Sequence, residues 1–557
     1  MITNSQIADQ LRAYADLLEM TGESGFRLNA YRRAAESIQQ HERPVATEPH
    51  VRSIPSVGAG IAAILNEIVT TGSFAALDEL QEQMPGSVLA LLDVPGVGLK
   101  TAARLYLELG ITSLAGLEDA IRDGRLGTMK GMGPKAQSRI AEGLLFLQRR
   151  SGRSSIGAAL PLAQRLAAEL AARVGVPVHV VGSVRRMCET TGNIDLLAIA
   201  DDAGGVLGAA GSLASVAGTI EREPDWASFE LQQGISLRVA VAPAARAGMA
   251  LVRWTGSSAH LAALGGVDAL PEAATEEEVY AGLAMDWVPP ELREDRGEVA
   301  AARERRLPRL IELGDLRGDL HLHTTWSDGS ASPMEMAVAA AARGYEYLAI
   351  TDHSGGLGVA GGLRPERLRE QITAIRALDG NAPVRLFTGS EVEVHRDGRL
   401  DFDDALLADL DLVVASLHSG LRQPGEEFTA RMLRTIANRH VDIIAHPTGR
   451  LVERRQGADI DWPQVFAAAR ETFTALEINA DPARLDMTDI VARAAAETGV
   501  LITINSDAHH PDGLAGVRYG VGIARRAWIE PRQVVNTWPL DEVMAWLRDR
   551  RLPDGLR

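Results

Sequence analysis

The sequence of 557 residues contains few lysines and more acidic than basic side chains. Its 57 basic residues include only three lysines, and its 74 acidic residues give a formal net charge of −17. DNA affinity comes largely from neutralised phosphates, so this charge excludes a protein held on nucleic acid by bulk attraction. Residues 1–150 have a net charge of −2 and the other 407 carry −15, so a DNA contact is expected first in the N-terminal part.

Cysteine and long hydrophobic runs are also scarce. The single cysteine, Cys188, excludes a disulfide within the chain and fits a reducing compartment. No run of 18 apolar residues indicates a membrane span, and charged residues interrupt the first 20 positions where a signal peptide would be apolar. The chain is therefore expected to be a cytoplasmic monomer without membrane contact. Its length predicts three or more domains.

Residues 1–150 show the apolar spacing of helices, as in Ile7, Leu11 and Tyr14. Three glycine-containing loops of one form, at 54–61, 94–100 and 129–135, separate these helices. The last two hold a G-x-G at which one helix ends and the next begins, so backbone N–H groups converge where a phosphate could bind. One such loop could be a simple helix turn, but their repetition favours sequence-independent contacts with the DNA backbone. The residues expected to make these contacts are Gly96, Gly98, Lys100, Gly131, Gly133 and Lys135.

After residue 150 the pattern changes to short apolar strands interleaved with helices. The predicted strands are Val178–Val181, Ile194–Ile199 and Leu237–Val241, which indicate a compact α+β unit that ends near Pro290. The charged stretch from Pro289 to Glu312 is predicted to be a connection with some helix.

Residues 317–557 alternate apolar strands with helical segments, and a polar residue follows each strand. Seven strands with seven polar ends predict a β/α barrel, in which chemistry takes place at the carboxyl ends of the strands. The seven runs begin at Gly318, Tyr347, Leu386, Leu412, Val441, Ala475 and Leu501.

Imidazoles and carboxylates gather at these strand ends. A single histidine would more often be a hydrogen-bonded core residue, but nine such side chains indicate a cluster of two or three divalent ions. Zn²⁺, Mn²⁺ or iron would suit the donor set, and a site of this kind hydrolyses phosphate esters. Arg450, just after His446, could hold a substrate phosphate or lie on the surface. The expected ligands are His321, His323, Asp328, His353, Glu391, His418, His446, Asp507 and His509.

Two sets of motifs resemble known families. His321-Leu-His323, Asp352-His353, His446-Pro447 and Asp507-Ala508-His509 are similar to the polymerase and histidinol phosphatase (PHP) metallohydrolases. The hairpin loops resemble X-family DNA polymerases, as do Gly182–Arg186, Asn193–Leu197 and Trp254–Ser257. Joined in this order, the two sets resemble bacterial PolX-type proteins over nearly the whole chain.

The resemblance implies a multidomain α+β protein. Its parts would be an all-α lyase-like region (1–80), helix-hairpin-helix fingers (81–150), a nucleotidyltransferase-like palm (151–243), a thumb (244–290), a linker (291–316) and a (β/α)7 PHP barrel (317–557). It also implies DNA repair, with gap filling by the palm and trimming of 3′ ends by the barrel. Gly182, Ser183 and Arg186 would bind the nucleotide, and Mn²⁺ or Zn²⁺ would occupy the barrel.

The predicted palm departs from the family pattern. The family holds two Mg²⁺ ions with three aspartates, but here Asn193 precedes Asp195 in the D-x-D position and Ser236 stands in the place of the third aspartate. Neutral oxygens bind hard cations weakly, which argues against Mg²⁺ there. Glu230 could face the same side of the strand as Ser236, but six residues away it is expected to be too distant to substitute.

Other departures affect the nucleotide and lyase positions. Arg253 and Leu261 replace an aromatic residue and an asparagine, and the lyase lysine position holds Ile64, which cannot form a Schiff base.

The sequence therefore predicts an enzyme for DNA ends, acting on gapped or nicked duplex. The barrel would serve as 3′-5′ exonuclease, 3′-phosphatase or abasic-site endonuclease on a scaffold whose polymerase site, left with Asp195, is inactive. Three alternatives remain open: an active gap-filling polymerase with the PHP exonuclease, a non-catalytic DNA-binding scaffold, and a phosphatase of small metabolites.

Overall fold

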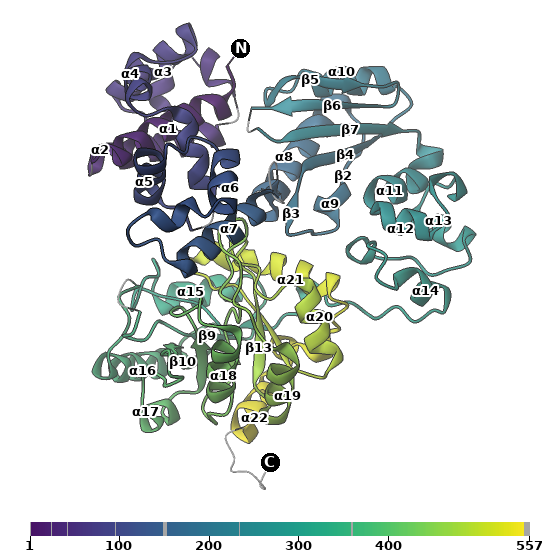
Figure 1. Cartoon of the computed structure of the whole chain (residues 1–557). Coiled ribbons are helices and arrows are strands. Elements are labelled where there is room, and N and C mark those ends of the chain that lie inside the picture. Colours follow the sequence, from purple (N-terminus) through teal and green to yellow (C-terminus); the bar gives the residue numbers. More distant parts are fainter. Residues whose placement is uncertain are drawn as a thin grey trace. The chain divides into compact units, whose positions relative to one another are not determined.

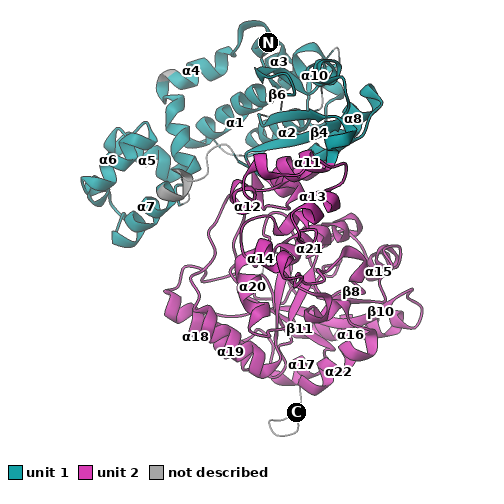
Figure 2. Ribbon diagram, turned by 90° about the vertical axis from the view of Figure 1, so that its right-hand side faces the viewer, with its two compact units in different colours: residues 1–154, 162–180, 192–247 teal, residues 155–161, 181–191, 248–557 magenta. Residues whose placement is uncertain are grey.

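The computed structural model describes residues 2–23, 25–41, 43–48, 50–94, 96–148, 153–232, 234–357 and 360–550. The domain boundary expected between residues 150 and 151 lies outside the described residues. The chain divides into two compact units, coloured separately in Figure 2. Unit 1 comprises residues 1–154, 162–180 and 192–247, and unit 2 comprises 155–161, 181–191 and 248–557.

The N-terminal part of unit 1 is helical, as predicted. Its first helix begins at a capping box in which the Thr3 side chain accepts from the Gln6 N–H and the Gln6 side chain accepts from the Thr3 N–H. Ile7, Leu11 and Leu17 on its inner face are fully buried in a continuous apolar core. The helices are α1 (Asn4–Met20), α2 (Phe26–Gln40), α3 (Ala59–Thr71), α4 (Ala75–Gln83), α5 (Leu99–Leu109), α6 (Leu114–Arg122) and α7 (Pro134–Gln148).

A five-stranded mixed sheet follows, in the order β2-β4-β7-β6-β5. Three of its strands are the predicted ones, and β5 and β6 were not predicted. Strand β5 forms one edge of the sheet and is almost entirely exposed, so it lacks the apolar alternation that would have revealed it. The bounds are β2 (Val178–Val181), β4 (Asn193–Ile199), β5 (Val216–Arg222), β6 (Trp226–Leu231) and β7 (Ser236–Ala242).

Two short strands and three helices complete this region. They are β1 (Ser154–Ser155), α8 (Ile156–Val174), α9 (Gly182–Arg185), β3 (Thr190–Thr191) and α10 (Ala203–Gly211).

Four more helices lie between the five-stranded sheet and the barrel along the chain: α11 (Ala247–Thr255), α12 (Ser258–Ala263), α13 (Glu276–Gly282) and α14 (Glu298–Arg303). The charged stretch that was predicted to be a connection contributes α14 and packs into their core, where Leu292, Val299 and Leu310 are buried with Tyr280. The segment from 289 to 312 is thus part of a packed structure.

The rest of unit 2 is the predicted barrel. Seven parallel strands run in the order β14-β13-β12-β11-β10-β9-β8. A bridge between Leu322 and Ala508, just beyond the two outer strands, nearly closes the sheet. The strands are β8 (Gly318–Asp319), β9 (Tyr347–Ile350), β10 (Arg385–Glu393), β11 (Leu412–Ser416), β12 (Ile443–Ile444), β13 (Ala475–Asn479) and β14 (Ile502–Asn505).

Helices surround these strands (Figure 1). They are α15 (Pro333–Ala341), α16 (Pro365–Asp379), α17 (Asp404–Ala408), α18 (Gly425–Ile436), α19 (Trp462–Thr472), α20 (Asp489–Glu497), α21 (Val517–Arg526) and α22 (Leu540–Arg550). Helix α22 covers the amino ends of the strands, since Trp546 donates to the Phe473 carbonyl just before β13. The carboxyl ends therefore remain available for a site.

In the described part of the chain, no single helix has the length and apolar character needed to cross a bilayer. One bent helix pair, Ala59–Thr71 with Ala75–Gln81 at 79°, meets the criterion by length and composition.

Substitution of Gly318 tests the packing at the first barrel strand. A Cβ there would overlap the Tyr347 ring and lie 2.5 Å from the Tyr347 carbonyl oxygen. We expect Gly318→Ala to lower the free energy of unfolding of unit 2 by about 1–3 kcal/mol, as overpacking does. Thermal unfolding followed by circular dichroism measures this. Gly314→Ala is the matched control because no atom lies within 4 Å of its Cβ position, and equal melting of the two variants would contradict the packing described.

Candidate metal centre and DNA-contact sites

The structure brings all nine expected ligands together at the carboxyl ends of the barrel strands. His321 and His323 follow β8, and Glu391 lies within β10. The remaining six come from the loops after the strands. Eight of the side chains form three overlapping groups, each with ligand atoms within 4.8 Å of one another: His323, Asp328, His353 and His509; His321, His323 and Asp507; His353, Glu391 and His418. The ninth, His446, contacts Glu391.

Glu391 lies at the centre of the cluster. One of its oxygens is 2.7 Å from His353 Nδ1, and the other is 3.0 Å from His446 Nε2 and 3.4 Å from His418 Nε2. Burial alone would raise the pKa of Glu391, but His418, His353 and His321 hold that pKa well below its ordinary value. The carboxylate is therefore ionised inside the barrel.

The donor set fits divalent cations. His321 Nε2 and His323 Nδ1 are buried and have no hydrogen-bond partner among the described residues. Leaving buried polar atoms unpaired costs free energy that a coordinated ion would offset. A cysteine-free set of imidazoles and carboxylates suits Zn²⁺, Mn²⁺ or iron.

Two glutamates that were not predicted as site residues orient these histidines. Glu477 on β13 accepts from His321 Nδ1 at 2.8 Å and from the His446 backbone N–H at 2.8 Å. Glu393 accepts from His418 Nδ1 at 2.8 Å. Such carboxylates fix the ring orientation and raise the basicity of the other ring nitrogen. A sequence signal existed, because both are ionisable residues inside otherwise apolar strands.

The backbone at two of the nine positions is strained. His446 and Asp507 have φ values of 26° and 54°, a region that side chains other than glycine rarely adopt. Strain of this kind persists where the surrounding structure enforces it, and it is common at functional sites.

Arg450 does not lie on the surface, and its side chain has partners within the protein. Its guanidinium is largely buried and donates to Glu189 at 2.6 Å and to the Arg484 carbonyl at 2.9 Å. The guanidinium that reaches the cluster belongs to Arg484, whose Nε lies 3.6 Å from Asp507 Oδ2.

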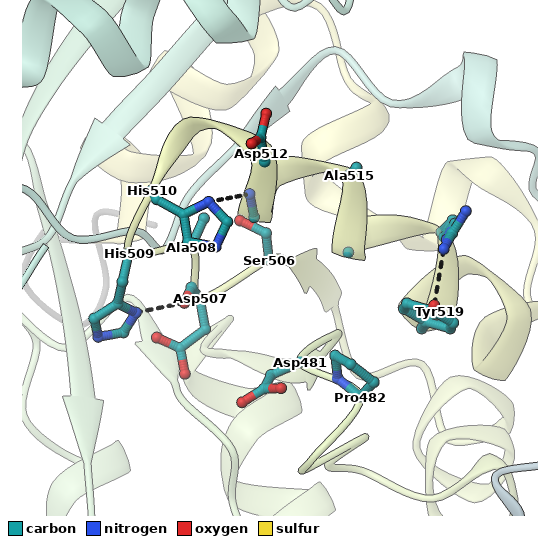
Figure 3. Close-up of a pocket in the computed structure, with 13 residues that line it drawn as sticks. Asp481, Pro482, Ser506, Asp507, Ala508, His509, His510, Asp512, Ala515 and Tyr519 are labelled. Atoms are coloured by element: carbon teal, nitrogen blue, oxygen red, sulfur yellow. Dashed lines mark hydrogen bonds between the residues drawn. The ribbon is translucent and has the colours of Figure 1, made fainter. Parts of the chain in front are cut away.

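A cavity of about 410 Å³ adjoins the cluster (Figure 3). Asp507 and His509 line it together with Asp481, Arg518 and Tyr519. Its walls come from the loops after β13 and β14 and from the start of α21.

In the predicted palm, internal donors occupy the one remaining aspartate. Asp195 is buried, and its Oδ1 accepts from Asn193 Nδ2 at 2.6 Å and from Arg238 Nε at 2.8 Å. Arg238 lies opposite Asp195 on β7, and Ser236 lies opposite Asn193. A guanidinium thus stands beside the carboxylate that a metal ion would need.

The expectation that Glu230 shares a strand with Ser236 is wrong, because Glu230 lies on β6, directly opposite Ser236 on β7. The expectation that it is too distant to substitute stays a prediction. Glu230 is exposed and two strands from Asp195, about 10 Å between the backbones. The sequence missed this because the turn between β6 and β7 was not recognised.

The predicted nucleotide-binding residues in unit 2 also have internal partners. Ser183 Oγ lies 2.5 Å from Thr191 Oγ1, and Gly182 begins α9 with a φ of 67°. Arg186 donates to Glu294 at 3.0 Å and to the Thr255 carbonyl at 2.7 Å.

The three hairpin loops have the same backbone form. Ser56, Gly96 and Gly131 occupy equivalent positions and have φ values of 65°, 96° and 83°. In each loop the next N–H donates to the carbonyl three residues earlier, at 3.2, 2.9 and 3.0 Å respectively. The first loop therefore matches the other two although serine replaces glycine.

Helices α3 and α5 begin after Gly58 and Gly98, which have no side chain to cap them. Gly133 likewise precedes α7, and Lys100 and Lys135 are exposed in the first turns that follow. First-turn N–H groups at such helix ends are suited to a phosphate oxygen.

Comparisons with known proteins match this organisation. A helix-hairpin-helix domain model matches residues 2–74, a SAM-like helix-hairpin-helix tandem matches 50–110 and 88–144, and a PHP domain matches 319–480. The chain is 35% identical over 569 residues to the DNA polymerase/3′-5′ exonuclease PolX of Bacillus subtilis, covering 97% of this chain and 98% of that protein.

The barrel region also has shorter relatives. A probable phosphatase of Edwardsiella ictaluri is 29% identical over 245 residues, covering 42% of this chain and 95% of that protein. One of Syntrophotalea carbinolica is 29% identical over 228 residues, covering 39% of this chain and 90% of that protein.

Glu477 provides a test of the metal centre that does not depend on activity. In Glu477→Gln, an amide N–H would replace one of the oxygens that accept from His321 Nδ1 and from the His446 backbone N–H. An amide nitrogen cannot accept these bonds, so His321 would lose its orientation. We expect the affinity for Mn²⁺ or Zn²⁺ to fall by about 10- to 100-fold, measured by competition with a chelator. Glu471→Gln, at an exposed position at the end of α19, is the control. Equal affinity in both variants would show that Glu477 does not support a metal site.

Proposed function

Because the chain belongs to the PolX family, we propose that it processes DNA ends, with the barrel hydrolysing phosphoesters at 3′ termini and the palm no longer polymerising. The observation that carries the hydrolytic part is the convergence of nine imidazole and carboxylate side chains with unpaired, buried donor atoms. The proposed activities are those of a 3′-5′ exonuclease and 3′-phosphatase, with abasic-site endonuclease activity as a further possibility of the same chemistry.

In this proposal the nine residues hold two or three divalent ions. Ions in such a site lower the pKa of water toward about 7 and offset the charge that develops on the phosphate oxygens. The protein contributes the geometry: Glu391 joins the three groups of ligands, and Glu477 and Glu393 fix the rings of His321 and His418. Burial excludes bulk water, which strengthens every electrostatic interaction at the centre.

The loss of polymerase activity is inferred from the contacts of Asp195. Two aspartates of the family pattern are replaced by Asn193 and Ser236, and the third shares its oxygen with Arg238. A cation already bound to the carboxylate competes with Mg²⁺, and neutral oxygens hold that ion weakly.

One observation favours the alternative of an active gap-filling polymerase. Glu230 is exposed and is paired with Ser236 on the neighbouring strand, so it supplies a carboxylate near the position where the family has its third aspartate. The separation from Asp195 and the guanidinium between them make this the second candidate.

The remaining expectations belong to the same proposal. The helix-hairpin-helix loops would hold gapped or nicked duplex by its phosphates, with domain limits as predicted from the sequence. The protein would act as a cytoplasmic monomer.

The two activities can be separated on an end-labelled gapped duplex with Mn²⁺ and nucleotides. Wild-type protein should shorten or dephosphorylate the 3′ end, and His323→Ala should lose this by at least about 100-fold, as expected when a metal ligand or its support is removed. His179→Ala, at an exposed position on β2, is the control and should retain hydrolysis.

The same assay tests the palm once degradation is prevented. His323→Ala should not extend the primer, and Asp195→Ala should leave hydrolysis nearly intact. Template-dependent extension by His323→Ala that is abolished by adding Asp195→Ala would show that the palm is catalytic.

The DNA-contact loops can be tested without disturbing their fold. No atom lies within 4 Å of a Cβ built at Gly98 or Gly133, and neither has a positive φ. Replacing both by valine should weaken duplex binding across sequences, because the side chains would keep phosphates from the helix N-termini. Fluorescence anisotropy measures this, with Gly314→Val as an equally open control. Equal affinity in the two proteins would mean that the loops only connect helices.

A further inference from the structure

Three arginines follow three neighbouring strands of the barrel. Arg422 follows β11, Arg455 follows β12 and Arg484 follows β13, and these strands are adjacent in the sheet. The carboxyl ends of parallel strands lie at one edge, so the three loops are consecutive around the rim that carries the nine expected ligands.

Of the three arginines, Arg484 lies beside the cluster of expected ligands. Its Nε lies 3.6 Å from Asp507 Oδ2, and its side chain is 19% exposed, so one side of the guanidinium faces the cluster and part of it reaches solvent. Arg484 is therefore close to one of the expected ligands.

Arg455 continues the series on the next loop. Its Nε donates to the Gly449 carbonyl at 2.8 Å, and no carboxylate lies within 4.0 Å of it in the described part of the chain. A Cβ at Gly449 would lie 2.6 Å from Leu421 Cδ2, so the loop of Arg455 packs against the loop that bears Arg422.

The charges of Arg484 and Arg422 act on Arg455. Burial and then the charges of Arg484 and Arg422 lower the pKa of Arg455. Arg422 is exposed and likewise has no carboxylate within 4.0 Å among the described residues. In a protein of net charge −17, these three guanidiniums have one ion pair among the described residues, the 3.6 Å contact of Arg484 with Asp507, and together they form a site that an anion would stabilise.

We propose that Arg484, Arg455 and Arg422 form a phosphate track for the DNA strand whose 3′ end enters the metal centre. Arg484 holds the phosphate beside Asp507, and Arg455 and Arg422 hold phosphates farther along the same strand. Guanidiniums suit this role because they bind phosphate oxygens in a bidentate manner, and contacts to the backbone carry no base preference. The track rests on the proposed hydrolytic function and extends it to the binding of the strand.

The track predicts a dependence on substrate length. With Mn²⁺ present, a long single-stranded oligonucleotide reaches all three arginines, whereas a thymidine p-nitrophenyl phosphate reaches only the inner one. Arg455→Gln and Arg422→Gln should each lower kcat/KM by about tenfold on the oligonucleotide and by much less on the small ester, so the ratio between the two substrates falls. Arg484→Gln should lower both.

Binding gives a readout that does not need turnover. In each of the three arginine variants, the affinity for an oligonucleotide with a non-hydrolysable 3′ end should depend less steeply on salt than in the wild type. The slope of log K against log salt should change by about 0.7 for each lost contact. Arg548→Gln removes the same charge from an exposed position on α22, at the opposite end of the barrel, and should change neither measurement.

The outcomes separate this proposal from the one on which it rests. If wild-type protein hydrolyses neither substrate, the proposed function fails. A second outcome is that the wild-type protein hydrolyses both substrates, while Arg455→Gln and Arg422→Gln have the same ratio of kcat/KM between the oligonucleotide and the small ester, and the same salt slope, as folded Arg548→Gln. In that case the phosphate track is wrong and the proposed metal centre is unaffected. Melting temperatures equal to that of the wild type identify the variants that are folded.

Discussion

The burial of Glu391 among histidines is the interaction on which the rest of the barrel site depends. This carboxylate lies within the longest barrel strand, and imidazoles from the ends of the neighbouring strands surround it. A buried charge is tolerated only when it is paired, so the parallel register that aligns these strand ends is also what stabilises the charge. Glu477 and Glu393 extend the same arrangement outward by fixing the histidines.

In the sheet of unit 1, a buried carboxylate is paired by a cation of the protein itself. Asp195 is also a buried carboxylate, but its charge is balanced by Arg238 and an amide of the protein itself. In the barrel, buried donor atoms lack protein partners, whereas at Asp195 the protein supplies the cation. This difference is the physical basis for our proposal that the barrel hydrolyses phosphoesters and that the sheet of unit 1 has a supporting role.

Much of this organisation could be predicted from the sequence. The barrel strands are buried on both faces and stand out as apolar runs. The nine expected ligands lie at or just after the carboxyl ends of these strands, so their convergence follows from the fold. Strand β5 was not predicted because its side chains are exposed. Glu477 was passed over although it is an ionisable residue inside an otherwise apolar strand, because the sequence does not show which histidine it contacts. The positions of Arg450 and Arg484 depend on loop conformations, which are set by tertiary contacts such as that with Glu189.

The central claim is that the strand ends hold a cluster of ions rather than a hydrogen-bonded polar core. The most direct measurement is elemental analysis of protein purified after growth with adequate manganese and zinc, combined with anomalous diffraction from its crystals. The account predicts two or three transition ions per chain, all within reach of Glu391 and Asp507. One ion or none, or ions located elsewhere, would contradict it.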